Sequence, residues 1–216
     1  MSFRVICISR TTAAGGENIG DAVAQRLGFR YVDEQIIERA AQLAQVDAKL
    51  VEASEHHKPL LQRLIDKLAT AYDLASPVSL ATGVPVDAFV PVSVGYQAVP
   101  EDLRQLIRAA IHEVAQLGGA VIVAHAASMA LAGTANVLRV LITASPATRA
   151  QRLSVARGLE TKAATAAVAQ SDRERSEYFR DFYEIKEELP THYDMVINTD
   201  VLTPQQAVEL IVTAAA

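Results

Sequence analysis

The segment RVICISRTTAAGGENIGDAVAQRLG, which runs from Arg4 to Gly28, contains an apolar run, a turn of small residues and a helical pattern in direct succession. Residues 3–8 have the composition of a buried strand, and residues 17–27 have the periodicity of a helix that ends at Gly28. Small residues at the start of a helix let backbone N–H groups approach an anion closely. The segment therefore predicts a phosphate-binding loop, although a tight strand-to-helix turn would explain the same residues.

The loop lacks the lysine of a standard Walker A motif, which ends in Gly-Lys-Ser/Thr and places the lysine on the transferred phosphate. The corresponding residues here are Gly15, Gly16, Glu17 and Asn18. Glu17 would repel a phosphate if its carboxylate pointed inward. Arg10, which follows the first predicted strand, is the best substitute for the missing cation. A surface ion pair, which would contribute little stability, is the alternative role for Arg10.

The composition is that of an ordinary globular chain, because 50% of the 216 residues are hydrophobic and 21% are charged. The net charge of −5 argues against a broad nucleic-acid-binding face. No apolar run reaches the roughly 18 residues of a membrane span, and no signal peptide is recognised. The single cysteine, Cys7, cannot form an internal disulfide. We therefore expect a cytoplasmic protein that binds neither nucleic acid nor membranes.

Short apolar runs alternate with longer helical patterns along the chain. Strands are predicted at residues 3–8, 29–32, 120–123, 137–142 and 195–197, and further helices at 34–43, 101–117 and 203–214. Apolar strands separated by helices predict an α/β fold with a mostly parallel sheet covered on both faces. Such sheets bind ligands at the carboxyl ends of their strands, which is where the small-residue loop would lie.

Two regions interrupt the alternation. Residues 56–74 have a helical pattern and lead into residues 75–100, which contain four prolines and are too long for a simple connection. This segment would be a lid, a binding loop or an arm that packs on a second subunit. Residues 160–189 are helical and highly charged. His56 and His57 have no third ligand nearby, so no metal site built from protein ligands alone is expected.

Four segments in order, residues 8–41, 137–153, 171–183 and 193–211, resemble the cytidylate kinase-like family. They include Ser9-Arg10, Gly15-Gly16 and Tyr31-x-Asp33, and they follow one another in the family's order between residues 8 and 211. The resemblance implies a P-loop kinase fold with three α/β/α layers, a five-stranded parallel sheet and a helical lid and acceptor insertion. It implies one domain over residues 1–216, with 54–100 as an acceptor-side insertion or interaction arm and 150–189 as the lid-like region.

The resemblance also implies roles for individual residues. Asp33 would lie near the acceptor phosphate, where a carboxylate orients a nucleophile or holds hydrated magnesium; capping the next helix is its alternative role. Arg149 and Arg175 would stabilise the transferred phosphate, as positioned guanidinium groups do. The residues expected around the donor nucleotide are Arg10, Thr11, Thr12, Ala13, Ala14, Gly15, Gly16, Glu17, Asn18, Arg152 and Asn198. Those expected on the acceptor side are Arg39, His125, Arg173 and Arg180.

Each of these roles has an alternative. Acidic residues are interleaved with Arg173, Arg175 and Arg180, so this segment would also fit a solvated charged helix. His125 would equally suit a half-buried position at a strand end. The sequence also departs from the family at several phosphate-facing positions, since Glu17 replaces an arginine and Ala124 and Ala126 flank His125 where the family often has Gly-Arg-Gly.

The resemblance implies a phosphotransferase that uses ATP and Mg²⁺ and moves the terminal phosphate to a nucleoside monophosphate or a similar small acceptor. The lost cations favour an alternative, a catalytically impaired nucleotide-binding or protein-interaction module on the same fold. A small-molecule nucleotide is the expected partner in the first case. A homo-oligomeric scaffold, built through residues 75–100, is a third option.

Overall fold

The computed structural model describes residues 2–33, 101–123 and 126–216, and its centre is a five-stranded sheet. The strands are β1 (Val5–Arg10), β2 (Arg30–Val32), β3 (Ala120–Ile122), β4 (Val137–Thr143) and β5 (Met195–Asn198). Their order is β2-β3-β1-β4-β5, and every neighbouring pair is parallel. The predicted parallel sheet of five strands is therefore confirmed.

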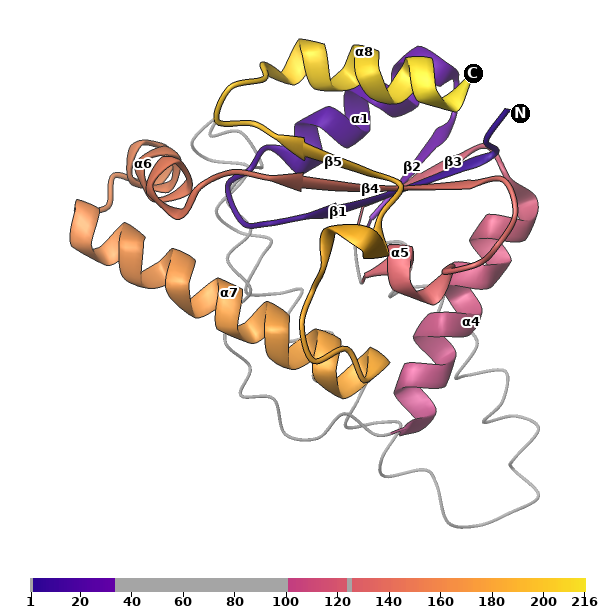
Figure 1. The fold of residues 1–216 in the computed structure, drawn as a ribbon, viewed down its shortest axis with the longest axis horizontal. Coiled ribbons are helices and arrows are strands. Elements are labelled where there is room, and N and C mark those ends of the chain that lie inside the picture. Colours follow the sequence, from indigo (N-terminus) through magenta and orange to yellow (C-terminus); the bar gives the residue numbers. More distant parts are fainter. Residues whose placement is uncertain (1, 34–100, 124–125) are drawn as a thin grey trace, which may run out of the picture.

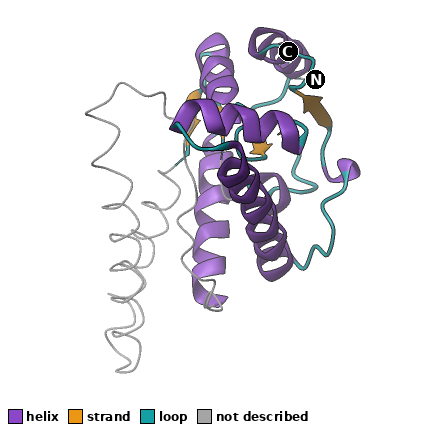
Figure 2. Cartoon of the chain, turned by 90° about the vertical axis from the view of Figure 1, so that its left-hand side faces the viewer, coloured by secondary structure: helices purple, strands orange, loops and turns teal. Residues whose placement is uncertain are grey.

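Helices cover both faces of the sheet. The described helices are α1 (Gly16–Leu27), α4 (Glu101–Leu117), α5 (Ala127–Ala130), α6 (Pro146–Arg157), α7 (Thr161–Tyr183) and α8 (Pro204–Ala215), with a 3₁₀ turn, η1, at Pro190–His192. Figure 1 shows α1 and α8 on one side of the sheet and α4, α5 and α7 on the other. The view turned by 90° shows the strands enclosed between helices (Figure 2). The predicted three-layer architecture is confirmed.

The alternation of β1 side chains explains why the sheet needs both helical layers. Ile6 and Ile8 belong to the core cluster that α1 and α8 cover, whereas Val5 and Cys7 belong to the cluster on the α4 side. All four side chains are at most 2% exposed. A strand buried on both faces has a continuous apolar run instead of an alternating pattern, which is what residues 5–8 show.

Two element boundaries differ from the predicted ones: the end of β1, which leads into the loop, and the extent of the charged helix. Strand β1 extends to Arg10 instead of residue 8, because Ser9 and Arg10 pair in register with Leu141 and Ile142 of β4. The charged region predicted over residues 160–189 contains one helix, α7, that ends at Tyr183. Predictions for residues 34–43, 54–100 and 124–125 lie outside the described residues. No helix in the described part of the chain is long and apolar enough to span a membrane.

Candidate functional site

The small-residue loop connects the carboxyl end of β1 to α1. The N–H of Thr11 donates to the carbonyl of Ile142 at 3.1 Å, and the N–H of Ala14 donates to the carbonyl of Thr11 at the same distance. Ala13 and Gly15 have positive φ values of 62° and 83°. The chain thus makes a tight turn at this edge of the sheet, and a glycine at position 15 adopts the left-handed conformation without a steric penalty.

The start of α1 has the geometry of an anion site. The first hydrogen bond of the helix runs from the N–H of Ile19 to the carbonyl of Gly15 at 3.1 Å. The N–H groups of residues 15–18 therefore precede the helical hydrogen-bond ladder, at the positive end of the helix dipole. Backbone N–H groups in this position favour phosphate or carboxylate oxygens.

Arg10 lies across this helix start. A Cβ atom at Gly16 would stand 2.6 Å from the Cβ of Arg10, so only glycine leaves room for the arginine stem. The Nε of Arg10 is 2.5 Å from the Oε1 of Glu17, and the two side chains are 23% and 21% exposed. The positive charge of Arg10 is thus paired with Glu17.

Asp33 follows β2 and is half-buried. Burial raises the pKa of the Tyr31 phenol, and the nearby carboxylates of Asp33 and Glu17 raise it further, while Arg10 acts in the opposite direction. Asp33, Glu17 and Arg10 therefore all lie close enough to Tyr31 to influence its ionisation. The structure brings the predicted acceptor-side carboxylate and the start of α1 into one neighbourhood.

Arg149 holds α6 and α7 together. Its Nη1 and Nη2 donate to the two carboxylate oxygens of Asp172 at 2.8 and 2.7 Å, and its Nε donates to the carbonyl of Ala144 at 3.0 Å. The residue is only 3% exposed. Its guanidinium group is therefore engaged within the fold, and its predicted role at the transferred phosphate stays a prediction.

Arg152 and Thr199 form hydrogen bonds with backbone carbonyls of the loop. Arg152 donates to the Oγ1 and the carbonyl of Thr199 at 2.9 and 2.6 Å and to the carbonyl of Ala13 at 3.4 Å. The Thr199 hydroxyl in turn contacts the carbonyl of Ala14 at 3.0 Å. The neighbouring Asn198, predicted to contact the donor base, is exposed, and its Oδ1 accepts from the N–H of Asp200 at 2.9 Å.

Arg175 connects α7 to the end of β1. Its Nη1 donates to the carbonyl of Arg10 at 2.8 Å and its Nη2 to the Oγ of Ser9 at 2.9 Å. Two further bonds, of 2.7 and 2.6 Å, reach the carboxylate of Glu188. The hydroxyl of Tyr193 contacts both Ser9 and Glu188. A helix that the sequence assigned to a lid is thus bonded directly to the strand that leads into the loop.

Thr12 adds a further link between the loop and α7, because its hydroxyl contacts that of Ser171 at 2.5 Å. The remaining predicted residues are separated from this network. Arg173 donates to Gln170 at 2.6 Å, and Arg180, whose side chain is 61% exposed, pairs with Asp181. Arg39 and His125 lie outside the described residues. No group of three or more His, Cys, Asp or Glu side chains able to hold a metal ion is found in the described ranges.

Ser9, Ser171, Glu188, Tyr193 and Thr199 complete the network, and the sequence assigned no site role to the first four. Ser9 and Tyr193 are separated by 184 positions, and Ser9 and Arg175 by 166. No local pattern marks such pairs. The one available signal was the position of Thr199, which lies with Asn198 in the turn after the last predicted strand, at the end of the sheet where such folds bind ligands.

A model described as the cytidylate kinase-like family matches residues 5–201. The chain belongs to the cytidylate kinase-like family. An uncharacterized protein from Eubacterium ventriosum is similar in structure, with a TM-score of 0.62, 15% identity, and coverage of 98% of this chain and 97% of that chain. A shikimate kinase from Bacteroides thetaiotaomicron has a TM-score of 0.51 at 14% identity, with coverage of 99% and 98%. No curated protein matches the chain.

The family match and the similar folds agree with a phosphate-binding loop between β1 and α1. Family membership supports a nucleotide kinase-like function, and the arrangement of strands and helices is that of P-loop kinases. The structural neighbours have low identity, so they establish the fold alone. The phosphate acceptor has to be inferred from this chain's own residues.

Proposed function

We propose that this protein is a phosphotransferase that moves the terminal phosphate of ATP to a nucleoside monophosphate or a similar small acceptor. The observation that carries the proposal is the loop at residues 11–18. Its N–H groups stand at the start of α1, at the carboxyl edge of a parallel sheet, in a chain of the cytidylate kinase-like family.

Binding of the triphosphate would depend on backbone N–H groups and on Arg10. The ion pair between Arg10 and Glu17 is about one fifth exposed on each side, and such pairs contribute roughly 0–1 kcal/mol. A triphosphate carries more charge than one carboxylate, so it would compete effectively for the guanidinium group. Gly16 keeps the arginine stem against the helix start, which positions the guanidinium group at the loop.

Asp33 would act on the acceptor. A half-buried carboxylate beside the loop would orient an acceptor, and where the nucleophile is a hydroxyl it would take the proton as the new P–O bond forms and the bond to the leaving diphosphate breaks. Asp33 also suits magnesium, which proteins commonly hold through one or two carboxylates together with substrate phosphates and water. The ion would neutralise developing charge on those phosphates.

A second candidate function is nucleotide binding without transfer. Arg149 and Arg175 each make a two-pronged contact with a carboxylate, and each also donates to a backbone carbonyl. To reach a phosphate, either guanidinium would first have to leave these partners. In this case α7 would support the loop, and the protein would bind nucleotide without moving its phosphate.

Calorimetry with ATP, with and without Mg²⁺, tests binding at the loop. Gly15→Ala places a methyl group at a left-handed residue that faces open space, and Gly28→Ala does the same at the opposite end of the same helix. Both variants should lose about 1–2 kcal/mol of stability, because alanine is strained in the left-handed conformation. We expect Gly15→Ala alone to weaken ATP binding by tenfold or more. Equal ATP affinity in the two variants would contradict binding at the loop.

A screen of nucleoside monophosphates with labelled ATP separates the two functions. Transfer that is lost in Asp33→Asn, with ATP affinity retained, would support the kinase. ATP binding without transfer to any monophosphate would support the nucleotide-binding module and contradict the kinase. Absence of ATP binding by the wild-type protein would exclude both proposals.

A further inference from the structure

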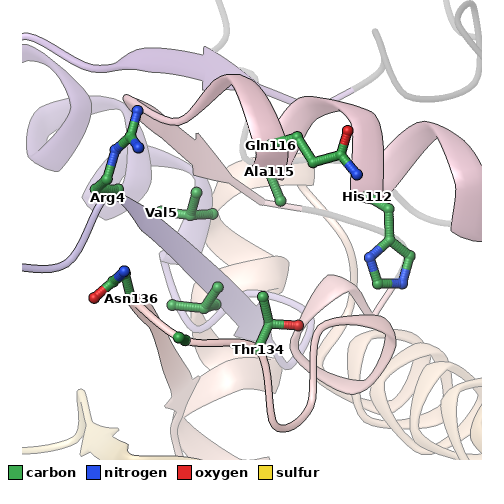
Figure 3. A pocket seen from close by; sticks show the side chains of 9 residues that line it. Arg4, Val5, His112, Ala115, Gln116, Thr134 and Asn136 are labelled. Carbon is green, nitrogen blue, oxygen red and sulfur yellow. The ribbon is translucent and has the colours of Figure 1, made fainter.

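A pocket lies at the amino ends of the central strands, at the end of the sheet opposite the loop. It has a volume of about 270 Å³ and is lined by the start of β1, the last turns of α4 and the residues that lead into β4. Figure 3 shows His112 and Gln116 extending from α4, and Thr134 and Asn136 from the segment before β4. β1 runs from this pocket at Val5 to Arg10 at the loop, a separation of roughly 17 Å.

The polar side chains of this pocket make no side-chain contacts of their own with the part of the chain that the structure describes. Five of its nine lining residues carry polar side chains, and none of the five forms a side-chain hydrogen bond or ion pair with the rest of the described chain: Arg4, His112, Gln116, Thr134 and Asn136. The loop region differs sharply, because Arg149, Arg152 and Arg175 are each engaged by several internal partners. The pocket therefore presents donors that are available to a ligand.

The charge of the lining selects the kind of ligand. Arg4 is positively charged, and no lining residue is acidic. The guanidinium group of Arg4 lies against Gly118, where a Cβ atom would stand 2.8 Å from its Nη2. Gly118 also has a positive φ of 67°, so a glycine is favoured there for conformation and for space. The glycine lets the guanidinium lie close over the turn between α4 and β3, beside the pocket.

We propose that this pocket binds a small organic anion. Its carboxylate or phosphate group would contact Arg4, because guanidinium groups pair with such oxyanions through two parallel hydrogen bonds. Gln116, Thr134 and Asn136 supply amide and hydroxyl groups for the polar remainder of the molecule. The site is separate from the phosphate-binding loop, and the proposal does not depend on the function proposed for that loop.

The test is calorimetric titration of the full chain with citrate and with inorganic phosphate, in the presence of saturating ATP where ATP binds. The two probes distinguish carboxylate from phosphate ligands. Arg4→Gln should weaken binding of the preferred probe by tenfold or more. Gln116→Ala is a second variant, since this exposed helical residue can be truncated without disturbing the core. Arg26→Gln is the matched control. It removes the same charge from α1, where Arg26 forms an exposed ion pair with Glu209 of α8.

The outcomes separate this pocket from the loop. The proposal is supported if the probe still binds in the presence of saturating ATP. Binding should also be lost in Arg4→Gln and unchanged in Arg26→Gln. Binding that ATP displaces would place the anion at the loop and overturn it. Equal effects of Arg4→Gln and Arg26→Gln, or no binding of either probe at millimolar concentration, would also overturn it.

Discussion

Replacing Glu188 by glutamine tests whether the arginine of α7 is a structural anchor. Glu188 receives two hydrogen bonds from Arg175, and the two side chains are 20% and 21% exposed. Burial tends to raise the pKa of Glu188, but the hydrogen bonds and charge of Arg175 outweigh burial and hold that pKa below its ordinary value. Glu188→Gln keeps the shape of the side chain and removes its charge.

The expected loss follows from the burial of the pair. Removing one partner of a fully buried ion pair costs about 3–5 kcal/mol, because the other charge is left uncompensated. Water reaches about one fifth of each side chain here, and Arg175 keeps its bonds to Ser9 and to the Arg10 carbonyl. We therefore expect Glu188→Gln to lower the free energy of unfolding by about 2–3 kcal/mol at pH 7.

The stability that Glu188 contributes should decrease in acid. The pKa of Glu188 is lower in the folded protein than in the unfolded chain, so its contribution is complete above the ordinary value of 4.5 and is lost as the pH falls through the folded pKa. The difference in unfolding free energy between the wild-type protein and Glu188→Gln should therefore narrow as the solution is acidified below that value.

Urea unfolding followed by circular dichroism measures both effects. Glu209→Gln is the control, because Glu209 pairs with Arg26 at 2.9 Å while both side chains are more than half exposed. That variant should stay within about 0.5 kcal/mol of the wild-type protein. A loss of less than about 0.5 kcal/mol for Glu188→Gln would refute the anchoring role of this pair.

Three further predictions concern other buried or paired groups. Asp172→Asn should lower the free energy of unfolding by about 2 kcal/mol in urea unfolding, because Arg149, whose side chain is 4% exposed, loses its counter-charge; an unchanged unfolding midpoint would contradict this. Hydrogen bonds from Arg139 hold the pKa of Asp194 below its ordinary 3.8, so Asp194 should stabilise the fold above that pH and lose this effect in acid. Asp194→Asn should therefore show a flatter stability profile than the wild-type protein below pH 3.8, and parallel profiles would refute the assignment. Burial raises the pKa of Cys7 to about 12, so a thiol reagent at pH 8 should label it only after unfolding, and rapid labelling of the native protein would contradict its burial.

Much of the fold was predictable from local sequence patterns. The apolar run at residues 5–8 indicated a buried strand, and Gly28 marked the end of α1, which begins at Gly16, one residue before the predicted start. The predicted helix at 203–214 differs from α8 by one residue at each end. Thr203 lies outside the helix because its side chain caps it, and Pro204 suits the first turn. These features depend on neighbouring residues, whose conformational preferences a sequence displays directly.

The candidate site was predictable only in outline. The sequence placed a phosphate-binding loop and several arginines in one region, but it left open whether those arginines were free to meet a ligand. The structure shows Arg149 bonded to Asp172, Arg175 bonded to Glu188 and Ser9, and Arg10 paired with Glu17.

The sequence by itself determined the strand, the loop and the helix that follow one another at the N-terminus, together with the parallel character of the sheet, whereas the order of its strands came from the structure. Only the tertiary structure decided which charges are already paired and which, like Arg4 at the opposite end of the sheet, have no side-chain partner among the described residues. The physical reason is that conformational preference acts between neighbours in the chain. The pairing of a guanidinium group with a carboxylate depends on distances that only the packed fold defines.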